Sequence, residues 1–283
     1  MRNIHLLSAI LLVSTALPAI AHGPAEARYL GNEGVMVTSG ETKVLFDPFY
    51  AESFDGQYTL VPGATEQAML AGQAPFDGID ALFISHIHPD HFSSRKTIAY
   101  LRAHPNVRLY AGLDVIGAIY AADVSVDDPI ARRLVVVNVA RGHPAKAFAV
   151  EGLDIEAFSI PHAGNGPIPH YAFRVTLNKG TTVMHLGDSD DAESHYLPYR
   201  DALAAKRIDA AFVPTWLLAS DSGKKVLTQI IRPVQTIAMH VEDKYRASAA
   251  KLREELGADA FVEPGETRAI RGNRARPPAR TAG

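Results

Sequence analysis

Short apolar runs separated by polar turns open the part of the sequence that we expect to fold. The runs lie at residues 27–30, 35–38 and 43–46, and the turns at residues 31–34 and 39–42 contain Gly, Asn, Ser and Thr. Runs of this length fit β-strands, and these residue types favour tight turns. The pattern therefore predicts a β-meander at the start of the domain.

Strand-like and helix-like segments alternate through the rest of the chain. Apolar residues near helical spacing predict helices at residues 93–104, 113–121, 226–231 and 246–256. Runs rich in β-branched or aromatic residues predict strands at residues 81–84, 107–110, 134–139, 147–150, 155–160, 171–177, 182–186, 210–213, 236–239 and 260–262. Residues 51–78 are rich in Gly, Pro and Gln, and we expect a long loop there that lies over a site.

The order of these elements indicates the fold class. Strands come first, strand–helix units follow, and the same succession is then repeated. Two sheets that pack face to face leave their outer faces to be covered by helices. We therefore predict an α/β (α+β) fold with four layers, an αββα sandwich, formed by residues 22–267 as one domain.

The N-terminal end differs from this central domain. Arg2 precedes an apolar stretch at residues 6–20, and residues 19–21, Ala-Ile-Ala, have the small-x-small pattern of a signal peptidase site. We expect residues 1–21 to be a signal peptide and the protein to be secreted or periplasmic. The apolar stretch is shorter than the roughly 20 residues of a membrane span. We therefore expect no stable membrane span after cleavage, and an uncleaved anchor is the alternative.

Composition narrows the possible ligands and partners. The chain has no cysteine, which excludes disulfides and thiolate metal ligands. The formal net charge is −3 with both signs mixed, so no nucleic-acid partner is expected. Arginines crowd residues 268–283, which we predict to be a basic, disordered tail, with a membrane or polyanion role as the alternative. The sequence carries no indication of the oligomeric state.

The strongest chemical signal is the run Ser-His-Ile-His-Pro-Asp-His-Phe directly after the predicted strand at residues 81–84. Three of the 12 histidines lie in it. Alternation at the end of a strand directs His86 and His88 the same way. The proline that follows breaks the strand and lets Asp90 and His91 point to a neighbouring position. This arrangement suits two adjacent metal ions, whereas the simpler interpretation is a histidine-rich surface loop.

Three further candidate ligands stand at the ends of other predicted strands. His162 is followed by a Gly-rich segment, Asp188 follows Gly187, and His240 ends the strand at residues 236–239. Taken singly, each is more often a structural residue. A packed sheet brings the ends of several strands to one edge, so together they complete the ligand set that a nitrogen–oxygen dinuclear site needs.

These residues resemble the metallo-β-lactamase superfamily. The resemblance rests on His86-x-His88-x-Asp90-His91 followed by His162, Asp188 and His240, and it spans nearly the whole mature chain. Residues 30–34 and 44–48 are similar to the opening of the branch that contains ascorbate-6-phosphate lactonase and N-acyl phosphatidylethanolamine phospholipase D. The resemblance implies a metallo-β-lactamase-like sandwich. It also implies one metal ion held by His86, His88 and His162, and a second held by Asp90, His91 and His240, with Asp188 bridging the two.

One departure from the β-lactamases of this fold bears on the activity. Those enzymes have a cysteine or no acid at the bridging position, whereas this chain has Asp188 and no cysteine. We therefore do not expect antibiotic hydrolysis. We expect an exported metal-dependent hydrolase that activates water for attack on a small-molecule ester, lactone or phosphodiester. Asp90 and Asp188 are the expected catalytic residues, because the first both ligates and orients the attacking water and the second bridges the ions.

The sequence allows more than one metal ion, function and proton donor. Zinc is the default for the two divalent ions, but imidazole and carboxylate ligands also accept iron or manganese. An iron-dependent, dioxygenase-like redox enzyme and a non-catalytic periplasmic metal- or ligand-binding protein are therefore alternative functions. His170, His185 and Asp190 are candidate proton donors, and His185 is also a candidate contact to a metal ligand. Tyr50 and Trp216 are candidate pocket walls, and the loops at residues 50–78, 163–170 and 215–224 are expected to select the substrate.

Overall fold

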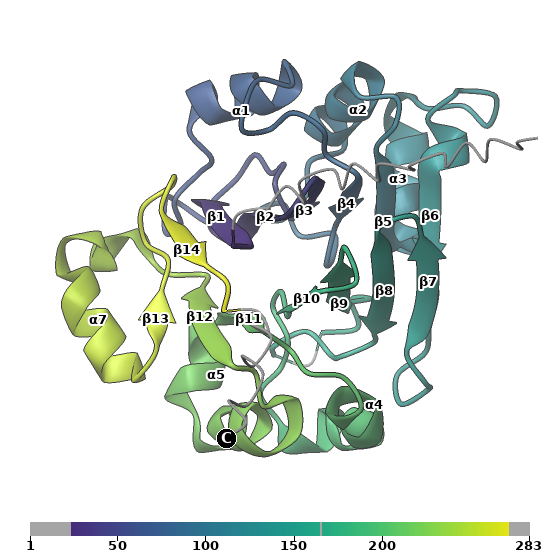
Figure 1. Cartoon of the computed structure of the whole chain (residues 1–283). Helices are drawn as coiled ribbons and strands as arrows, with labels where there is room; N and C mark the ends of the chain where they lie inside the picture. Colours follow the sequence, from purple (N-terminus) through teal and green to yellow (C-terminus); the bar gives the residue numbers. More distant parts are fainter. Residues whose placement is uncertain (1–23, 165, 272–283) are drawn as a thin grey trace, which may run out of the picture.

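Two mixed sheets, each of seven strands, form the centre of the protein in a computed structural model that describes residues 24–164 and 166–271 (Figure 1). The first sheet has the order β14-β1-β2-β3-β4-β5-β6. Its strands are β1 (Glu26–Gly31), β2 (Gly34–Ser39), β3 (Thr42–Phe46), β4 (Ala81–Phe83), β5 (Arg108–Gly112), β6 (Leu134–Val137) and β14 (Thr267–Ala269). The predicted meander is its antiparallel part, and β3 to β6 run parallel.

The second sheet has the order β13-β12-β11-β10-β9-β8-β7. Its strands are β7 (Lys146–Val150), β8 (Leu153–Phe158), β9 (Ala172–Leu177), β10 (Thr181–His185), β11 (Ala210–Pro214), β12 (Gln235–Met239) and β13 (Asp259–Ala260). Strands β10 to β13 are parallel, and β7 to β10 pair antiparallel. Because β8 is two antiparallel steps away from β10, both strands point their carboxyl ends to the same edge.

Helices cover the outer faces of both sheets. The first sheet carries α1 (Gly63–Leu70), α2 (Ser94–Ala103) and α3 (Leu113–Asp123), and the second carries α4 (Arg200–Ala204), α5 (Thr215–Ala219), α6 (Asp221–Lys225) and α7 (Ala249–Leu256) (Figure 1). Short 3-10 helices lie at Ala131–Arg133, Glu193–His195, Leu197–Tyr199 and Asp243–Ser248. The order helix, sheet, sheet, helix confirms the predicted four-layer αββα sandwich.

Alternation along the strands produces three hydrophobic layers. Val35 and Val37 of β2 face the other sheet, while Met36 between them packs toward the helices. In β10, Val183 faces the inner layer and Met184 the outer helices. Each sheet is covered on both faces, which explains why its strands are continuous hydrophobic runs rather than alternating ones.

The structure corrects several details of the sequence analysis. The expected loop at 215–224 consists of α5 and the start of α6. The expected loop at 51–78 contains α1. Its sequence includes good helix formers, but Gly63 at its start and Gly72 beyond its end weakened the helical pattern. The helix expected at 226–231 is a π-helix, Val226–Ile231. The expected boundary of the tail, residue 268, was placed too early, because β14 pairs with β1 and Ile270 is buried.

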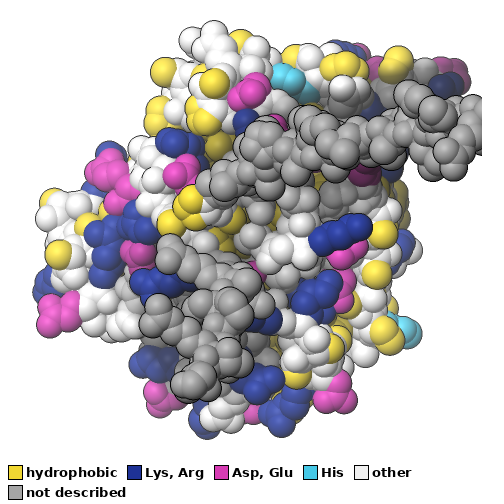
Figure 2. All heavy atoms as spheres, in the orientation of Figure 1, with side chains coloured by type: hydrophobic (Ala, Val, Ile, Leu, Met, Phe, Trp, Pro, Cys, Tyr) yellow, Lys and Arg dark blue, Asp and Glu magenta, His cyan; other side chains and the backbone are white. Residues whose placement is uncertain are grey.

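The surface and the chain ends bear on the expected partners. Acidic and basic side chains are interspersed on the face drawn in Figure 2, and no patch of one sign dominates that view. Across residues 24–164 and 166–271, no helix combines the length and apolar character that a membrane crossing requires. The predicted signal peptide, residues 1–21, and the end of the predicted tail lie outside the described residues.

Candidate metal centre

The candidate ligands all follow strands at the same edge of the sandwich. His86, His88, Asp90 and His91 come after β4 of the first sheet. The other three follow strands of the second sheet, His162 after β8, Asp188 after β10 and His240 after β12. The carboxyl ends of parallel strands meet at one edge, which is where ligands bind in open α/β sheets. Segments far apart in the sequence therefore converge between the two sheets.

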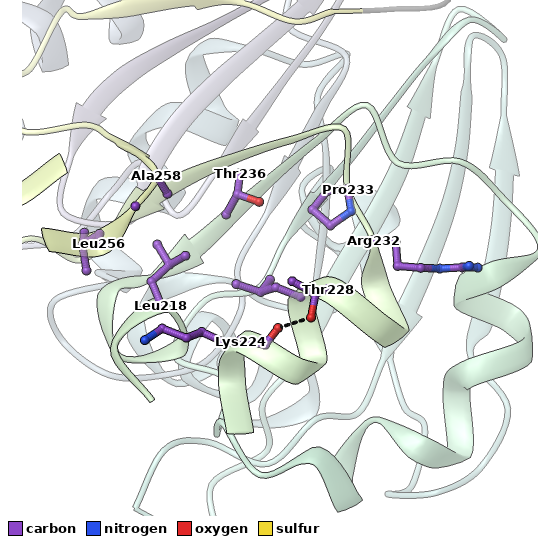
Figure 3. A pocket seen from close by; sticks show the side chains of 10 residues that line it. Leu218, Lys224, Thr228, Arg232, Pro233, Thr236, Leu256 and Ala258 are labelled. Carbon is purple, nitrogen blue, oxygen red and sulfur yellow. Dashed lines mark hydrogen bonds between the residues drawn. The ribbon is translucent and has the colours of Figure 1, made fainter. Parts of the chain in front are cut away.

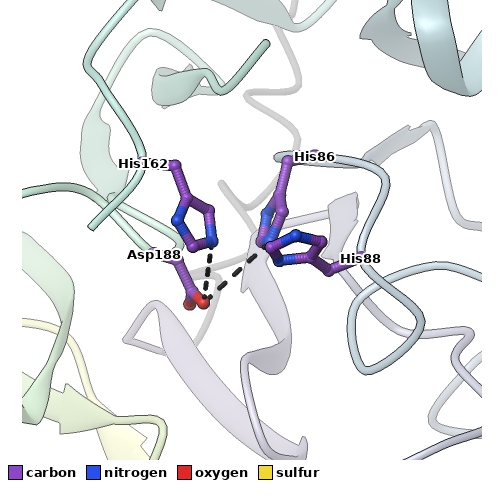
Figure 4. A group of neighbouring side chains, drawn as sticks. All are labelled: His86, His88, His162 and Asp188. Carbon is purple, nitrogen blue, oxygen red and sulfur yellow. Dashed lines mark ion pairs between the residues drawn. The ribbon is translucent and has the colours of Figure 1, made fainter. Parts of the chain in front are cut away.

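The structure brings all seven candidate side chains together in two groups. His86, His88, His162 and Asp188 form the first group, and Asp90, His91 and His240 form the second. Within each group the potential ligand atoms lie within 4.8 Å of one another. Figure 4 shows the first group, with three imidazoles around the carboxylate. We refer to these as the first and second ligand groups.

Asp188 lies between the two ligand groups. Its Oδ2 is 3.4 Å from Nε2 of His162 and 4.0 Å from Nε2 of His86. Its Oδ1 is 3.2 Å from Nε2 of His91 and 3.3 Å from Nε2 of His240. One oxygen thus faces each group, which is the arrangement of a carboxylate that can bridge two cations.

The atoms that face this space have no hydrogen-bond partner among the described residues. They are Nε2 of His86, His91, His162 and His240, together with Oδ1 of Asp90 and of Asp188. Buried polar atoms without partners are rare and each requires an explanation. Imidazole nitrogens and carboxylate oxygens that converge in this way fit divalent zinc, iron or manganese, so the residues present suit a dinuclear metal site.

The pKa shifts of the metal-free ligand groups also support a cation site. Burial by itself lowers the pKa of His240, but the carboxylates of Asp188 and Asp90 outweigh it and raise the pKa to about 9. Burial by itself would raise the pKa of Asp188, but His240 and His91 hold it well below its usual range. Burial lowers the pKa of His86 well below its usual range, and the charge on His91 adds to this. Protons therefore occupy part of a site that a cation would take over.

Asp47 supports the second ligand group and was not identified from the sequence. It follows β3 and accepts hydrogen bonds from the backbone N–H of Ser85 at 2.8 Å and from Nδ1 of His91 at 2.9 Å. A carboxylate behind an imidazole fixes the tautomer and directs the other nitrogen to the metal. The position of Asp47 at a strand end, before a proline, was a signal that could have identified it.

The turn between β1 and β2 also reaches the centre. Nδ2 of Asn32 donates to the carbonyl of Asp90 at 3.1 Å and to its Oδ2 at 3.2 Å. The preceding Gly31 has φ of 144°, and a Cβ there would lie 2.6 Å from the hydroxyl of Tyr50. Only glycine fits such a conformation and such a close contact. The turn therefore places Asn32 behind Asp90, and nothing in its sequence indicated this role.

The three candidate proton donors have other partners in the fold. Burial lowers the pKa of His170 to about 3, so its imidazole is neutral, and Nδ1 lies 3.0 Å from the carbonyl of Ile160. Nε2 of His185 lies 3.2 Å from the buried carboxylate of Glu33, which is not one of the candidate ligands. Asp190 lies 3.0 Å from Nδ1 of His195. None of these contacts supports a proton donor to the leaving group.

Aromatic side chains flank the second ligand group. The ring of Trp216, a residue expected to line a pocket, lies 5.1 Å from that of His240, and its Nε1–H donates to the carbonyl of Ser189 at 2.8 Å. Tyr58, which sequence reasoning missed, lies in the segment between β3 and α1, and its ring is 4.0 Å from that of His240. Tyr50 is buried instead, and its hydroxyl donates to the carbonyl of Thr59. His240 is thus covered by two rings.

Two cavities differ in their relation to the ligand groups. One of about 400 Å³ lies at the same edge and is lined by Val139, Ala140, Arg141, Ser159 and residues 167–171. Another, of about 610 Å³, lies near Thr236, at the start of β12, whereas His240 follows the end of that strand (Figure 3). The larger cavity is therefore remote from the ligand groups, and of these two only the smaller one is placed to receive part of a substrate.

Known families and solved structures share this fold. Residues 42–262 match the family described as Beta-lactamase superfamily domain. No curated protein sequence matches the chain. Igni18, a metallo hydrolase from Ignicoccus hospitalis, superimposes with a TM-score of 0.57 at 15% identity over 87% of this chain and 98% of that chain.

Two other solved structures show the range of proteins with this fold. An isothiocyanate hydrolase from Delia radicum gut bacteria gives a TM-score of 0.59 at 16% identity over 86% of this chain and 98% of that chain. CmlA, a diiron β-hydroxylase from Streptomyces venezuelae, gives 0.52 at 14% identity over 87% of this chain and 54% of that chain. At these identities the likeness shows the fold alone.

Proposed function

This chain belongs to the beta-lactamase superfamily and has its metallo-hydrolase fold, and we propose that it hydrolyses a small-molecule ester, lactone or phosphodiester at a pair of divalent metal ions. The observation that supports this most strongly is the position of Asp188. Each of its oxygens faces the unpartnered Nε2 atoms of a different ligand group. A mononuclear site would leave one of these groups without a role.

The residues of the two ligand groups would have different roles in this reaction. Bound ions would act as Lewis acids and lower the pKa of water toward neutrality. Asp188 would hold the two ions at a fixed separation, and Asp90, held by Asn32, would orient the attacking water. His162 is 13% exposed, whereas the second group is buried and covered by Trp216. The substrate would therefore enter from the side of the first ligand group.

The proposed substrates are esters, lactones and phosphodiesters. The opening of the sequence supports the branch of ascorbate-6-phosphate lactonase and N-acyl phosphatidylethanolamine phospholipase D, which act on a lactone and a phosphodiester. The Asp188 carboxylate argues against β-lactam hydrolysis. Because a structural neighbour is an isothiocyanate hydrolase, isothiocyanates belong in the assay panel.

The test combines metal analysis with a panel of substrates. Purified protein should contain two divalent ions per chain, with zinc as the expected metal, and should turn over at least one of bis(p-nitrophenyl) phosphate, a lactone series, carboxyl esters or isothiocyanates. His88→Ala and Asp188→Ala should abolish that turnover and lower the metal content. His143→Ala and Asp127→Ala, which change exposed residues of the same types, are the matched controls.

Other outcomes would point to the alternative functions. Full activity in either ligand variant would refute the assignment. Bound iron with oxygen uptake would instead indicate redox chemistry. Metal-loaded protein that is inactive on the whole panel would favour a binding protein.

We also propose that the protein is exported. The support is the signal-like pattern of residues 1–21. N-terminal sequencing of the protein recovered outside the cytoplasm should begin at His22. Recovery of the intact N-terminus from the membrane fraction would indicate an uncleaved anchor instead.

A further inference from the structure

Ser85 lies at the junction between the two ligand groups. It precedes His86, and its side chain is buried. Its hydroxyl contacts Oδ2 of Asp47 on one side and Nδ1 of His86, at 3.0 Å, on the other. Asp47 also lies 2.9 Å from Nδ1 of His91. A continuous chain of contacts thus joins a histidine of the first group to a histidine of the second.

The directions of these hydrogen bonds follow from the donors that each group carries. A carboxylate accepts hydrogen bonds, so the single hydroxyl proton of Ser85 is donated to Asp47. The oxygen of Ser85 can then only accept from His86. Nδ1 of His86 must therefore carry a proton and donate it to this oxygen. The lone pair of His86 is therefore at Nε2, the atom that faces Asp188 at 4.0 Å. Asp47 accepts directly from Nδ1 of His91, so a neutral His91 also has its lone pair at Nε2.

We propose that Ser85 is a positioning residue through which Asp47 sets the imidazole of His86. One carboxylate thereby orients a ligand in each group. This inference rests on the proposed function, because it concerns metal binding at those groups.

The contacts predict an asymmetry between two variants. In Ser85→Ala, Asp47 still accepts from the backbone N–H of residue 85 and from Nδ1 of His91, so the second group is retained, while the buried Nδ1 of His86 loses its acceptor. In Asp47→Ala, both imidazoles lose their orientation. Loss of such a partner typically costs about 10- to 100-fold in metal affinity.

The experiment measures zinc bound per chain and the affinity of each binding step by chelator competition. Ser85→Ala should weaken one step by about 10- to 100-fold and leave the other within about twofold, whereas Asp47→Ala should weaken both. Ser39→Ala is the matched control, because Ser39 is also buried, its hydroxyl lies 3.0 Å from that of Thr181, and it stands at the end of β2 away from the ligand groups. In that control both steps should stay within about a factor of two of wild type. Circular dichroism should show that every variant is folded.

Double variants identify the weakened step. With the second group disabled by His240→Ala, adding Ser85→Ala should weaken the remaining binding. With the first group disabled by His88→Ala, adding it should change little. If Ser85 had a merely structural role, Ser85→Ala would lower the metal affinity equally in both backgrounds.

The failures can be told apart. If wild type binds two ions and Ser85→Ala leaves both affinities unchanged, or lowers both to the same extent, this inference is wrong while the proposed function stands. If wild type takes up no metal, the proposed function is overturned and the inference with it.

Discussion

At the scale of single residues, the candidate centre is a set of buried titratable groups that satisfy one another only in part. Asp188 faces imidazoles of both ligand groups, yet its Oδ1 makes no hydrogen bond to the residues that the structure describes. Buried charge without full compensation costs several kcal/mol. In the metal-free protein this cost is offset by protons on histidines, and in the loaded protein it would be offset by the cations.

His240 provides a pH-dependent test of that exchange. In the metal-free protein its pKa is raised to about 9, above the roughly 6.5 of an unfolded chain. Its contribution to stability is therefore fully present below about pH 6.5 and is lost as the pH rises through about 9. The loss should reach the order of 3 kcal/mol at most. Urea unfolding of chelator-treated protein at about pH 6.5 and about pH 9.5, on either side of this window, measures it.

The control for this prediction is His240→Asn, which removes the titrating group and should reduce the drop between the two pH values. Protein loaded with zinc should also show a smaller drop, because the cation occupies the position of the proton. Equal drops in metal-free wild type and in the variant would contradict the pKa shift as the cause.

At the scale of elements, the turns between strands position the centre as much as the strands themselves. The turn after β1 carries Asn32 to Asp90 and depends on the backbone of Gly31. The segment that follows β3 carries Asp47 to His91. Asn32 and Asp47 are each the first residue after a strand, so a change at either strand end shifts a contact to the ligand groups directly.

Gly31→Ala should test how tightly the first turn is fixed. The new Cβ would lie 2.6 Å from the hydroxyl of Tyr50 and 2.9 Å from the carbonyl of Thr59, at a φ of 144°. We expect a loss of about 1–3 kcal/mol in the free energy of unfolding, together with lower metal affinity. Chemical denaturation and metal titration measure the two effects.

Gly117→Ala is the matched control, because Gly117 lies inside α3 and a Cβ there meets nothing within 4 Å. It should stabilise the protein by up to about 1 kcal/mol, since alanine favours a helix. Should Gly31→Ala behave like Gly117→Ala, the turn does not depend on glycine.

The elements also show what could be predicted from the sequence. Periodicity predicted the strands and the larger helices because each depends on neighbours within a few residues. It missed α1, where glycines and few buried residues left a weak pattern, with Met69 as its buried side chain. The ligand candidates were identified from residue type and strand ends. Asn32 and Asp47 were missed because the residues that they contact lie 58 and 44 positions away along the chain, although the place of Asp47 at a strand end was a usable signal.

At the scale of the whole molecule, the ligand groups connect the two sheets. His86, His88, Asp90 and His91 come from the first sheet, and His162, Asp188 and His240 from the second. Bound ions would therefore fasten the halves of the sandwich at one edge. The inner hydrophobic layer holds the remainder of the interface between the sheets.

Metal removal should accordingly lower the stability of the entire domain. A ligand that binds only the folded state contributes about 2.7 kcal/mol at a concentration roughly 100 times its dissociation constant. We expect a chelator to lower the melting temperature of wild type, and zinc to restore it. Asp188→Ala should respond much less to either addition. A melting temperature that is the same with chelator and with zinc would show that metal binding is not linked to folding.

The division of ligands between the sheets has a consequence for how the protein matures. A growing or truncated chain that stops before residue 188 has the four ligands after β4 but lacks the carboxylate that faces both groups, and a chain that stops before residue 240 lacks the last imidazole. Neither fragment can assemble the centre. Loading with both ions would therefore require a chain synthesised through residue 240 and folded so that the ends of β4, β8, β10 and β12 lie together.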